Sequence, residues 1–261
     1  MANLGNEENL AGSNRRGDFL IRSPYGVALA FTLLAVLALP FDAPLARTFI
    51  EGDLPGDLVR IVYLSEIFAH GGGVILLLLT AFVLDVANRR RLVRVGMSAL
   101  CGGALANSVK MLVARTRPDD FNLNSNILAS FEGWLPFLGL PSAEEWDHSL
   151  QGFPSAHAAT AVGFALGLAM VYPQGRRLFL AFAALASFQR MVSGSHFLSD
   201  VLVGAALGIV GAAILRRGAF LGKYFDAWEN KTSTPTTLPV HVPGQYGGSQ
   251  PAVSTLLSQN K

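Results

Sequence analysis

The stretch that decides the fold is "PSAHAATAVGFALGLAMVYP", residues 154–173. Beyond its first four letters the stretch is almost entirely apolar, and its length matches the roughly 20 residues that a helix needs to cross a bilayer. Yet Ser155 and the ionisable His157 stand at its start. Ionisable side chains within membrane helices are costly and usually face a protein interior or a water-filled cavity. The stretch therefore predicts a membrane helix whose N-terminal end forms part of a polar site.

Five further apolar stretches have a similar length. They cover residues 24–41, 70–87, 95–114, 177–194 and 196–215. Hydrophobic residues make up 51% of the chain and charged residues only 15%, whereas a soluble domain carries about 25% charged residues. We therefore predict an all-α fold, an integral membrane bundle of six transmembrane helices that covers residues 21–218.

The two ends of the chain differ from this bundle. Residues 1–20 and 219–261 are polar and rich in Asn, Ser, Thr, Pro, Gly or Gln, which is typical of disordered tails. The apolar run at 24–41 exceeds the roughly 7–15 residues of a signal-peptide core, so we interpret it as a retained anchor. A net charge of +2 gives no reason to expect nucleic-acid binding, and a single cysteine, Cys101, permits no internal disulfide.

Lysine and arginine predict the orientation of the bundle. They gather before the first span, in "NRRRLVR" (88–94), in "QGRR" (174–177) and after the sixth span. The connection 119–153, in contrast, contains six acidic residues and neither lysine nor arginine. Because cytoplasmic loops are enriched in lysine and arginine, we predict that both termini are cytoplasmic. A bacterial inner membrane fits this compact core, with the opposite face towards the periplasm or exterior.

Polar side chains gather at the outer ends of the predicted spans. They are Lys110, Arg117, Ser155, His157, Arg190, His196 and Asp200. Hydropathy defines the spans and loop charge defines the sides, yet both place all seven residues at a similar depth on one side. Several cations together suit an anion with several oxygens, and the arginine fork suits phosphate in particular. We therefore expect one anion-binding pocket at the outer boundary of membrane and water.

Residue spacing within this set favours specific pairs. Lys110 and Arg117 are seven residues apart, about two helical turns, and would share a face. His196 and Asp200 are four apart, within hydrogen-bonding range on a helix. An aspartate that holds one imidazole nitrogen leaves the other as an oriented nucleophile. Arg115 lies off the spacing of Lys110 and Arg117, so we interpret it as an interfacial anchor.

Three segments of the chain resemble the motifs of the type-2 phosphatidic acid phosphatase superfamily, which includes membrane lipid phosphatases and soluble vanadium haloperoxidases. The segments are "KMLVARTRP" (110–118), "PSAH" (154–157) and "QRMVSGSHFLSD" (189–200). The likeness covers about residues 60–216. Ala156 stands where the superfamily pattern has glycine, and Gln189 where it has serine. Neither departure removes a reacting group, although alanine would be strained if its position needed a positive φ.

The resemblance implies a reaction in two displacements without a metal or another cofactor. His196 would attack phosphorus and form a phosphohistidine while Asp200 fixes its tautomer. His157 would protonate the leaving oxygen and then help water to attack. The phosphate oxygens would be held by Lys110, Arg117, Arg190, Ser155 and backbone N–H groups near Ala156.

These residues favour a phosphatase that acts on a phosphate monoester or diphosphate of a membrane lipid. Undecaprenyl diphosphate, phosphatidylglycerophosphate, phosphatidic acid and lipid A types of substrate all remain open. A lipid phosphotransferase would use the same residues, with an alcohol in place of water. A vanadate haloperoxidase would not need six spans, and an anion transporter would not need two histidines and an aspartate.

Two outer segments complete the predictions. "LPGDLVRIVYLSEIF" (54–68) has apolar residues at helical spacing, which predicts an amphipathic helix at the outer interface. "ILASFEGWLPFLGL" (127–140) carries Trp134 and could form either a lid near the pocket or a plain surface loop. His70 lies at an outer helix end and is interpreted as an interfacial residue.

Overall fold

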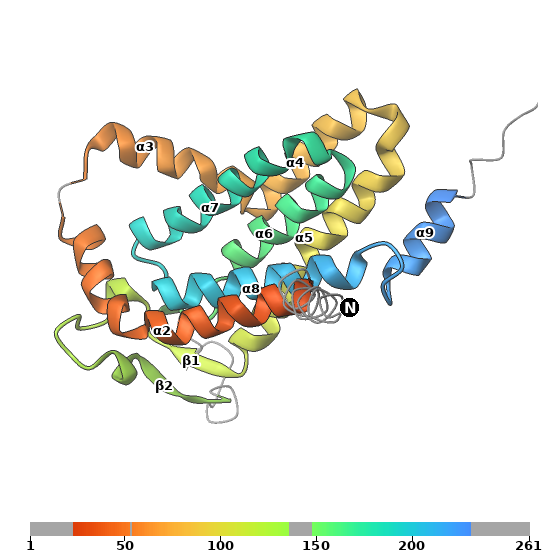
Figure 1. Cartoon of the computed structure of the whole chain (residues 1–261). Coiled ribbons are helices and arrows are strands. Elements are labelled where there is room, and N and C mark those ends of the chain that lie inside the picture. Colours follow the sequence, from red (N-terminus) through yellow and green to blue (C-terminus); the bar gives the residue numbers. More distant parts are fainter. Residues whose placement is uncertain (1–22, 53, 136–147, 231–261) are drawn as a thin grey trace, which may run out of the picture.

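A computed structural model describes residues 23–52, 54–135 and 148–230 of the chain, which are mostly helical (Figure 1). Each predicted span overlaps one long helix. These helices are α2 (Pro24–Ile50), α4 (Gly71–Leu84), α5 (Arg89–Lys110), α6 (Ala156–Val171), α7 (Arg176–Val192) and α8 (Leu198–Leu215). The all-α prediction is therefore confirmed for the described residues. The predicted N-terminal tail lies outside them.

Helix α6 forms the centre of the bundle because α5, α7 and α8 all pack against it, while α2 packs along α8. Small residues permit this close packing. A Cβ atom on Gly102 of α5 would lie 2.7 Å from the carbonyl oxygen of Ala159, and one on Gly208 of α8 would lie 2.5 Å from the same oxygen. Small residues at helix interfaces are typical of membrane bundles, where packing rather than burial from water drives association.

Three helical segments are long and apolar enough to span a membrane: α2, Val86–Lys110 and α8. A fourth span exists if the pair Gly56–Phe68 and Gly71–Leu84, bent by 69°, counts as one. Helix α6 is apolar but has only 16 residues. Outward-facing apolar side chains such as Leu37 are widely exposed, as lipid contact requires. The helices indicate a membrane protein, and the number of six spans stays a prediction.

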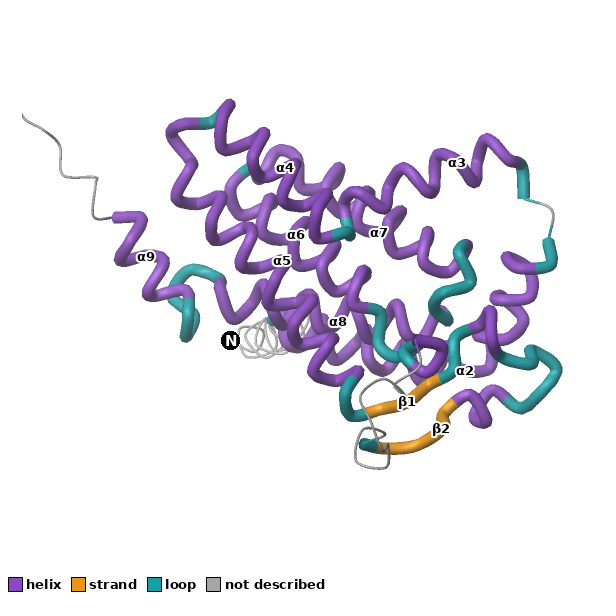
Figure 2. Tube along the Cα trace, turned by 180° about the vertical axis from the view of Figure 1, so that it is seen from behind, coloured by secondary structure: helices purple, strands orange, loops and turns teal. Residues whose placement is uncertain are grey.

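The connecting segments build one end of the bundle. Helix α3 (Gly56–Leu64) continues into η1 (Ser65–Phe68), so the helix predicted at 54–68 is present. Strand β1 (Val113–Arg115) pairs with β2 (Phe131–Trp134) in an antiparallel hairpin that lies beside α2 (Figure 2). The short turns are η2 (Val86–Asn88), η3 (Pro118–Asp120), η4 (Ile127–Ser130), η7 (His148–Leu150) and η8 (Pro173–Gly175).

The hairpin changes the interpretation of 127–140. Its first half pairs with β1 instead of forming a free loop, and the Trp134 side chain is mostly exposed. Residues 136–140 lie outside the described part, so a lid over the pocket stays a prediction.

Helix α9 (Gly222–Asn230) corrects the prediction of a disordered tail from residue 219. Arg94 of α5 is buried and pairs with Asp226 at 2.7 Å and Glu229 at 2.9 Å, which fixes α9 against the bundle. The hydrogen bond from Arg94 lowers the pKa of Asp226. A polar composition did not reveal this helix because its order depends on a buried cation of another helix. Residues 231–261 lie outside the described part.

Candidate active site

The predicted site residues come together at one end of the bundle. Lys110 ends α5, Arg190 lies near the end of α7, and Ser155 and Ala156 begin α6. The charges of Lys110, Arg117 and Arg190 lie close enough to act on the imidazoles of both His157 and His196. Segments far apart in the sequence thus place three cations around two histidines.

His196 has a fixed orientation. Its side chain is buried, and its Nδ1 lies 2.6 Å from the carbonyl oxygen of Gly152. A carbonyl can only accept a hydrogen bond, so Nδ1 carries the proton and the neutral ring has its lone pair on Nε2. The Gly152 N–H donates to the carbonyl of Arg115 at 2.8 Å, which holds the acceptor in place. The ring therefore presents Nε2 as a nucleophile.

Asp200 does not hold His196, contrary to the prediction from their spacing. One carboxylate oxygen accepts the N–H of Phe197 at 2.7 Å, and the other pairs with Arg115. The backbone carbonyl of Asp200 also accepts the N–H of Ser155 at 3.1 Å. The spacing rule failed because α8 begins at Leu198, so His196 precedes the helix. Asp200 instead joins the His196 loop to the start of α6.

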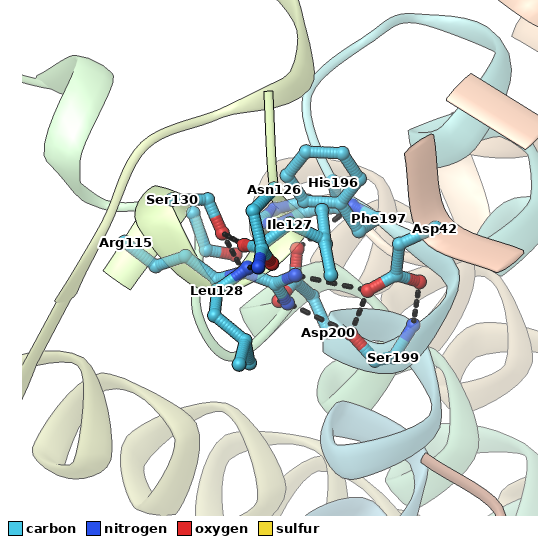
Figure 3. A network of polar contacts seen from close by, with 11 residues as sticks. Asp42, Arg115, Asn126, Ile127, Leu128, Ser130, His196, Phe197, Ser199 and Asp200 are labelled. Carbon is cyan, nitrogen blue, oxygen red and sulfur yellow. Dashed lines mark hydrogen bonds and ion pairs between the residues drawn. The ribbon is translucent and has the colours of Figure 1, made fainter. Parts of the chain in front are cut away.

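Arg115 is a buried structural centre and not an interfacial anchor. Its guanidinium is fully buried and pairs with Asp42 of α2 at 2.9 Å and with Asp200 (Figure 3). It also donates to Ser130 at 3.0 Å and to Ser199 at 2.7 Å. The Phe131 and Phe197 rings lie 4.4 and 4.5 Å from its carbon Cζ. We call Asp42, Arg115, Ser199 and Asp200 the buried network.

The carboxylates of the buried network neutralise the guanidinium of Arg115. Without these partners, the removal of this charge from water would be prohibitively costly. Asp42 reinforces the network, since its carboxylate accepts both the N–H and the hydroxyl of Ser199. Sequence reasoning missed Asp42, which follows the predicted span 24–41 directly. A carboxylate in the continuation of an apolar helix was the available signal.

The cations of the site keep unused donors. Lys110 Nζ donates to the carbonyl of Gln151 at 2.7 Å, and Arg190 Nη2 donates to the Ser195 hydroxyl at 2.8 Å. Among the described residues, however, the buried Nε atoms of Arg117 and Arg190 have no hydrogen-bond partner. An unpaired buried N–H of a cation is unfavourable. Bound oxyanions would supply the missing acceptors.

The start of α6 and the end of α7 accommodate the two departures from the superfamily pattern. Ser155 is the buried N-cap, and its hydroxyl accepts the Ala158 N–H at 3.4 Å. Ala156 has no positive φ, because Leu135 is the one non-glycine residue with positive φ in the described part. The strain considered for alanine is therefore absent. Gln189 is buried, and its side-chain oxygen accepts a hydrogen bond from Arg190 at 3.3 Å.

Glu66 of η1 is a site residue that sequence reasoning missed. Its carboxylate lies 3.3 Å from Arg190 Nη1 and 3.9 Å from His157 Nε2. The His70 and His157 ring centroids are 6.2 Å apart, so His70 borders the site as well as the outer helix end. No motif marks Glu66, and only its place four residues before His70 could have indicated it.

A helical bundle with these groups at one end defines the class of protein. The PAP2 superfamily matches residues 91–221, and the chain belongs to this superfamily. The match includes the cations, both histidines and Asp200, but neither Asp42 nor Glu66.

Three similar proteins have names that state an activity. The lipid A 1-phosphatase of Rhizobium johnstonii is 33% identical over 132 residues, which cover 48% of this chain and 49% of the relative. That of Rhizobium etli is 35% identical over 106 residues, covering 41% and 40%. The decaprenylphosphoryl-5-phosphoribose phosphatase of Mycobacterium tuberculosis is 31% identical over 163 residues, covering 62% and 81%. The chain thus spans half or less of the two Rhizobium relatives. No solved structure is a significant match.

Proposed function

We propose that this protein is a membrane phosphatase that hydrolyses a lipid phosphate or diphosphate through a phosphohistidine at His196. One observation carries the proposal. The buried His196 has its Nδ1 hydrogen bonded to a carbonyl, and its imidazole lies within electrostatic range of Lys110, Arg117 and Arg190, of which the two arginines keep unpaired buried donors. This combination supplies an oriented nucleophile. It also supplies unpaired N–H donors to which the oxygens of a phosphoryl group can bind.

In the first displacement, the lone pair of His196 Nε2 attacks phosphorus. A P–N bond forms while the P–O bond to the lipid breaks. His157 donates its proton to the leaving oxygen, which belongs to a lipid alcohol or, for a diphosphate, to a lipid monophosphate. The Arg190 guanidinium and Lys110 ammonium stabilise the charge on the equatorial oxygens, as positioned cations do in phosphoryl transfer.

In the second displacement, water attacks the phosphohistidine. The neutral His157 takes the proton from that water, the P–N bond breaks and its electron pair returns to His196 Nε2. Inorganic phosphate is released and both histidines regain their starting states. The carboxylate of Glu66 lies 3.9 Å from Nε2 of His157, the imidazole that carries the proton in both displacements.

The membrane helices and the relatives support a lipid phosphate as the substrate. The Rhizobium relatives are named for lipid A and the Mycobacterium relative for a decaprenylphosphoryl sugar phosphate. These names support a lipid that carries a phosphate at the membrane surface. The distribution of lysine and arginine supports a site on the periplasmic side of a six-span bundle.

Phosphate release in detergent tests the proposal. We expect the wild-type protein to release phosphate from lipid phosphates with a chelator present. His196→Ala should abolish release, and acid-labile radiolabel should remain on wild-type protein after rapid quenching with a labelled substrate. Ser108→Ala, an exposed position on α5, is the control and should keep full activity. Label on the His196→Ala variant, or release only with added metal, would contradict the mechanism.

A further inference from the structure

A cationic pocket of about 410 Å³ lies at the end of the bundle that carries α9, away from the β1–β2 hairpin (Figure 1). Four arginines line it: Arg91 and Arg94 in the first turns of α5, and Arg216 and Arg217 directly after α8. Among the described residues that line the pocket, Glu229 of α9 is the one carboxylate. The volume is within the range of about 300–1,000 Å³ that is typical of small-molecule sites. Segments distant in the sequence thus form a pocket at the opposite end of α5 from the candidate active site.

The pocket carries more positive than negative charge. Asp226 at 2.7 Å and Glu229 at 2.9 Å match the charge of the buried Arg94. Glu229 also approaches Arg217, but only to 4.0 Å, and the Arg217 side chain is mostly exposed, so this second pair contributes little. Among the described residues, four guanidinium groups are therefore accompanied by two carboxylates. The surplus of two positive charges is available to an anion.

The remaining wall of the pocket is apolar. Met170 and Val171 are the last residues of α6, and Pro173 begins η8. The pocket therefore lies where α5 begins and where α6 and α8 end. Because these helices are predicted membrane spans, their ends mark the boundary between the hydrocarbon core and the headgroup layer. A wall that is cationic on one part and apolar on another matches the junction between the phosphate and the hydrocarbon chains of a phospholipid.

Helix α9 presents aromatic side chains away from the bundle. Its inner face carries Phe225, whose ring centroid lies 5.5 Å from Cζ of Arg94, together with the two carboxylates that pair with this arginine. Tyr224 and Trp228 are four residues apart on another face, and both are exposed, as is Phe220 just before the helix. Tyrosine and tryptophan are enriched at membrane–water interfaces, and amphipathic helices with such a face lie in the interface plane. These side chains indicate that α9 lies in the headgroup layer beside the pocket.

We propose that this pocket binds the headgroup of an anionic phospholipid from the leaflet on the α9 side of the membrane. The phosphate oxygens accept hydrogen bonds from Arg91, Arg216 and Arg217, and the acyl chains leave along the apolar wall at the end of α6. Basic pockets between membrane helices suit anionic headgroups in this way. A free phosphate has the same oxygens, but it leaves the apolar wall and the exposed aromatic side chains without a partner. The bound lipid connects α5, α8 and α9, and its binding does not depend on the proposed phosphatase activity.

Fluorescence quenching by brominated lipids tests this proposal with the full chain in vesicles of phosphatidylglycerol and phosphatidylcholine. In a background with Trp134→Phe and Trp146→Phe, Trp228 is the one tryptophan of the chain, and it adjoins Glu229 of the pocket. We expect brominated phosphatidylglycerol to quench Trp228 with about a fivefold higher relative affinity than brominated phosphatidylcholine, because only the former carries a net negative charge. Arg216→Gln combined with Arg217→Gln should reduce this preference to less than about twofold.

A second exposed arginine pair supplies the matched control. Arg176→Gln combined with Arg177→Gln removes the same charge at the start of α7, from residues that do not line the pocket, and should keep the preference. An equal loss in both double variants would show attraction to the basic surface in general and would overturn the pocket. Equal quenching by the two lipids in the background protein would do the same.

Two further measurements complete the test. Loss of the phosphatidylglycerol preference when inorganic phosphate replaces chloride at the same ionic strength would assign the pocket to free phosphate and overturn the lipid as its occupant. If the variant with both substitutions after α8 does not fold, crosslinking of the wild-type protein decides, with phosphatidylglycerol that carries a diazirine next to its headgroup. Labelling of residues 170–173 or 216–217 supports the proposal, and labelling confined to other segments overturns it.

Discussion

At the scale of single residues, the orientation of His196 depends on a backbone carbonyl. The Gly152 carbonyl accepts a hydrogen bond from His196 Nδ1–H, and the Arg115 carbonyl in turn accepts one from the Gly152 N–H. Asp200 acts one step away, through the N–H of Phe197. The tautomer of His196 is thus set by main-chain geometry, while the buried network keeps the segments that carry this geometry in register.

Asp200→Asn distinguishes these two roles. If the carboxylate fixed the tautomer directly, its loss would lower kcat by about 10⁴, as happens when a catalytic histidine takes the wrong tautomer. Because Gly152 fixes it here, we expect kcat to fall by less than about a hundredfold, with lower resistance to unfolding. Steady-state rates and the pH profile of kcat in detergent measure this. A profile shifted by a full unit in a stably folded variant would argue for direct contact with His196.

Asp42→Asn tests the buried network at its residue on α2. The amide cannot neutralise the buried Arg115, so we expect a loss of about 3 kcal/mol in the free energy of unfolding. Unfolding titrations in mixed micelles with increasing SDS measure the change. Asp57→Asn is the matched control because Asp57 pairs with Arg60 on the exposed surface. Equal stability of the two variants would show that the network carries no stabilising charge pair.

At the scale of elements, hydropathy located the long helices because a membrane helix needs one continuous apolar run. Elements that depend on a distant partner were not predictable in this way. The β1–β2 hairpin carries the buried Arg115 at the end of β1, and the carboxylate partners of this arginine lie on α2 and α8. The predicted hydrogen bond between His196 and Asp200 was wrong for a related reason. A four-residue spacing brings side chains together only inside a helix, and His196 precedes the first residue of α8. The three motifs contain the predicted site residues, which the fold brings to one end of the bundle, whereas Asp42 and Glu66 lie outside every motif.

Docking of α9 should depend on pH through Asp226. The pKa of this carboxyl is lowered from its ordinary 3.8 by the Arg94 hydrogen bond. The ionised Asp226 therefore stabilises the docked α9 fully at pH values above the ordinary pKa of the carboxyl. This stabilisation is lost as the pH falls through the lowered pKa that Asp226 has in the docked state. We expect Trp228 fluorescence, with Trp134 and Trp146 replaced by Phe, to report release of α9 below about pH 4. Asp226→Asn should remove that transition, and a transition that persists in this variant would assign it to another group.

At the scale of the whole molecule, the candidate site and the α9 contact lie at opposite ends of the bundle. Helix α5 connects them, since Arg94 lies in its first turns and Lys110 ends it. In the predicted six-span topology, the end of the bundle that carries α9 faces the cytoplasm and the histidines lie at the opposite membrane face. The topology thus determines on which side of the membrane a lipid phosphate would be cleaved.

Cysteine labelling tests this topology. Cys101 is the one cysteine of the chain, so Cys101→Ser gives a background for single cysteines at Ser125, in the connection that follows the third predicted span, and at Gln174, between α6 and α7. A membrane-impermeant maleimide added to spheroplasts should label the Ser125→Cys variant at once and the Gln174→Cys variant only after lysis. Labelling of both variants in intact spheroplasts would put the two positions on the same side of the membrane. The segment that contains α6, the one predicted span between them, would then not cross the membrane. The reverse pattern would place the histidines in the cytoplasm, and the substrate would then come from the inner leaflet.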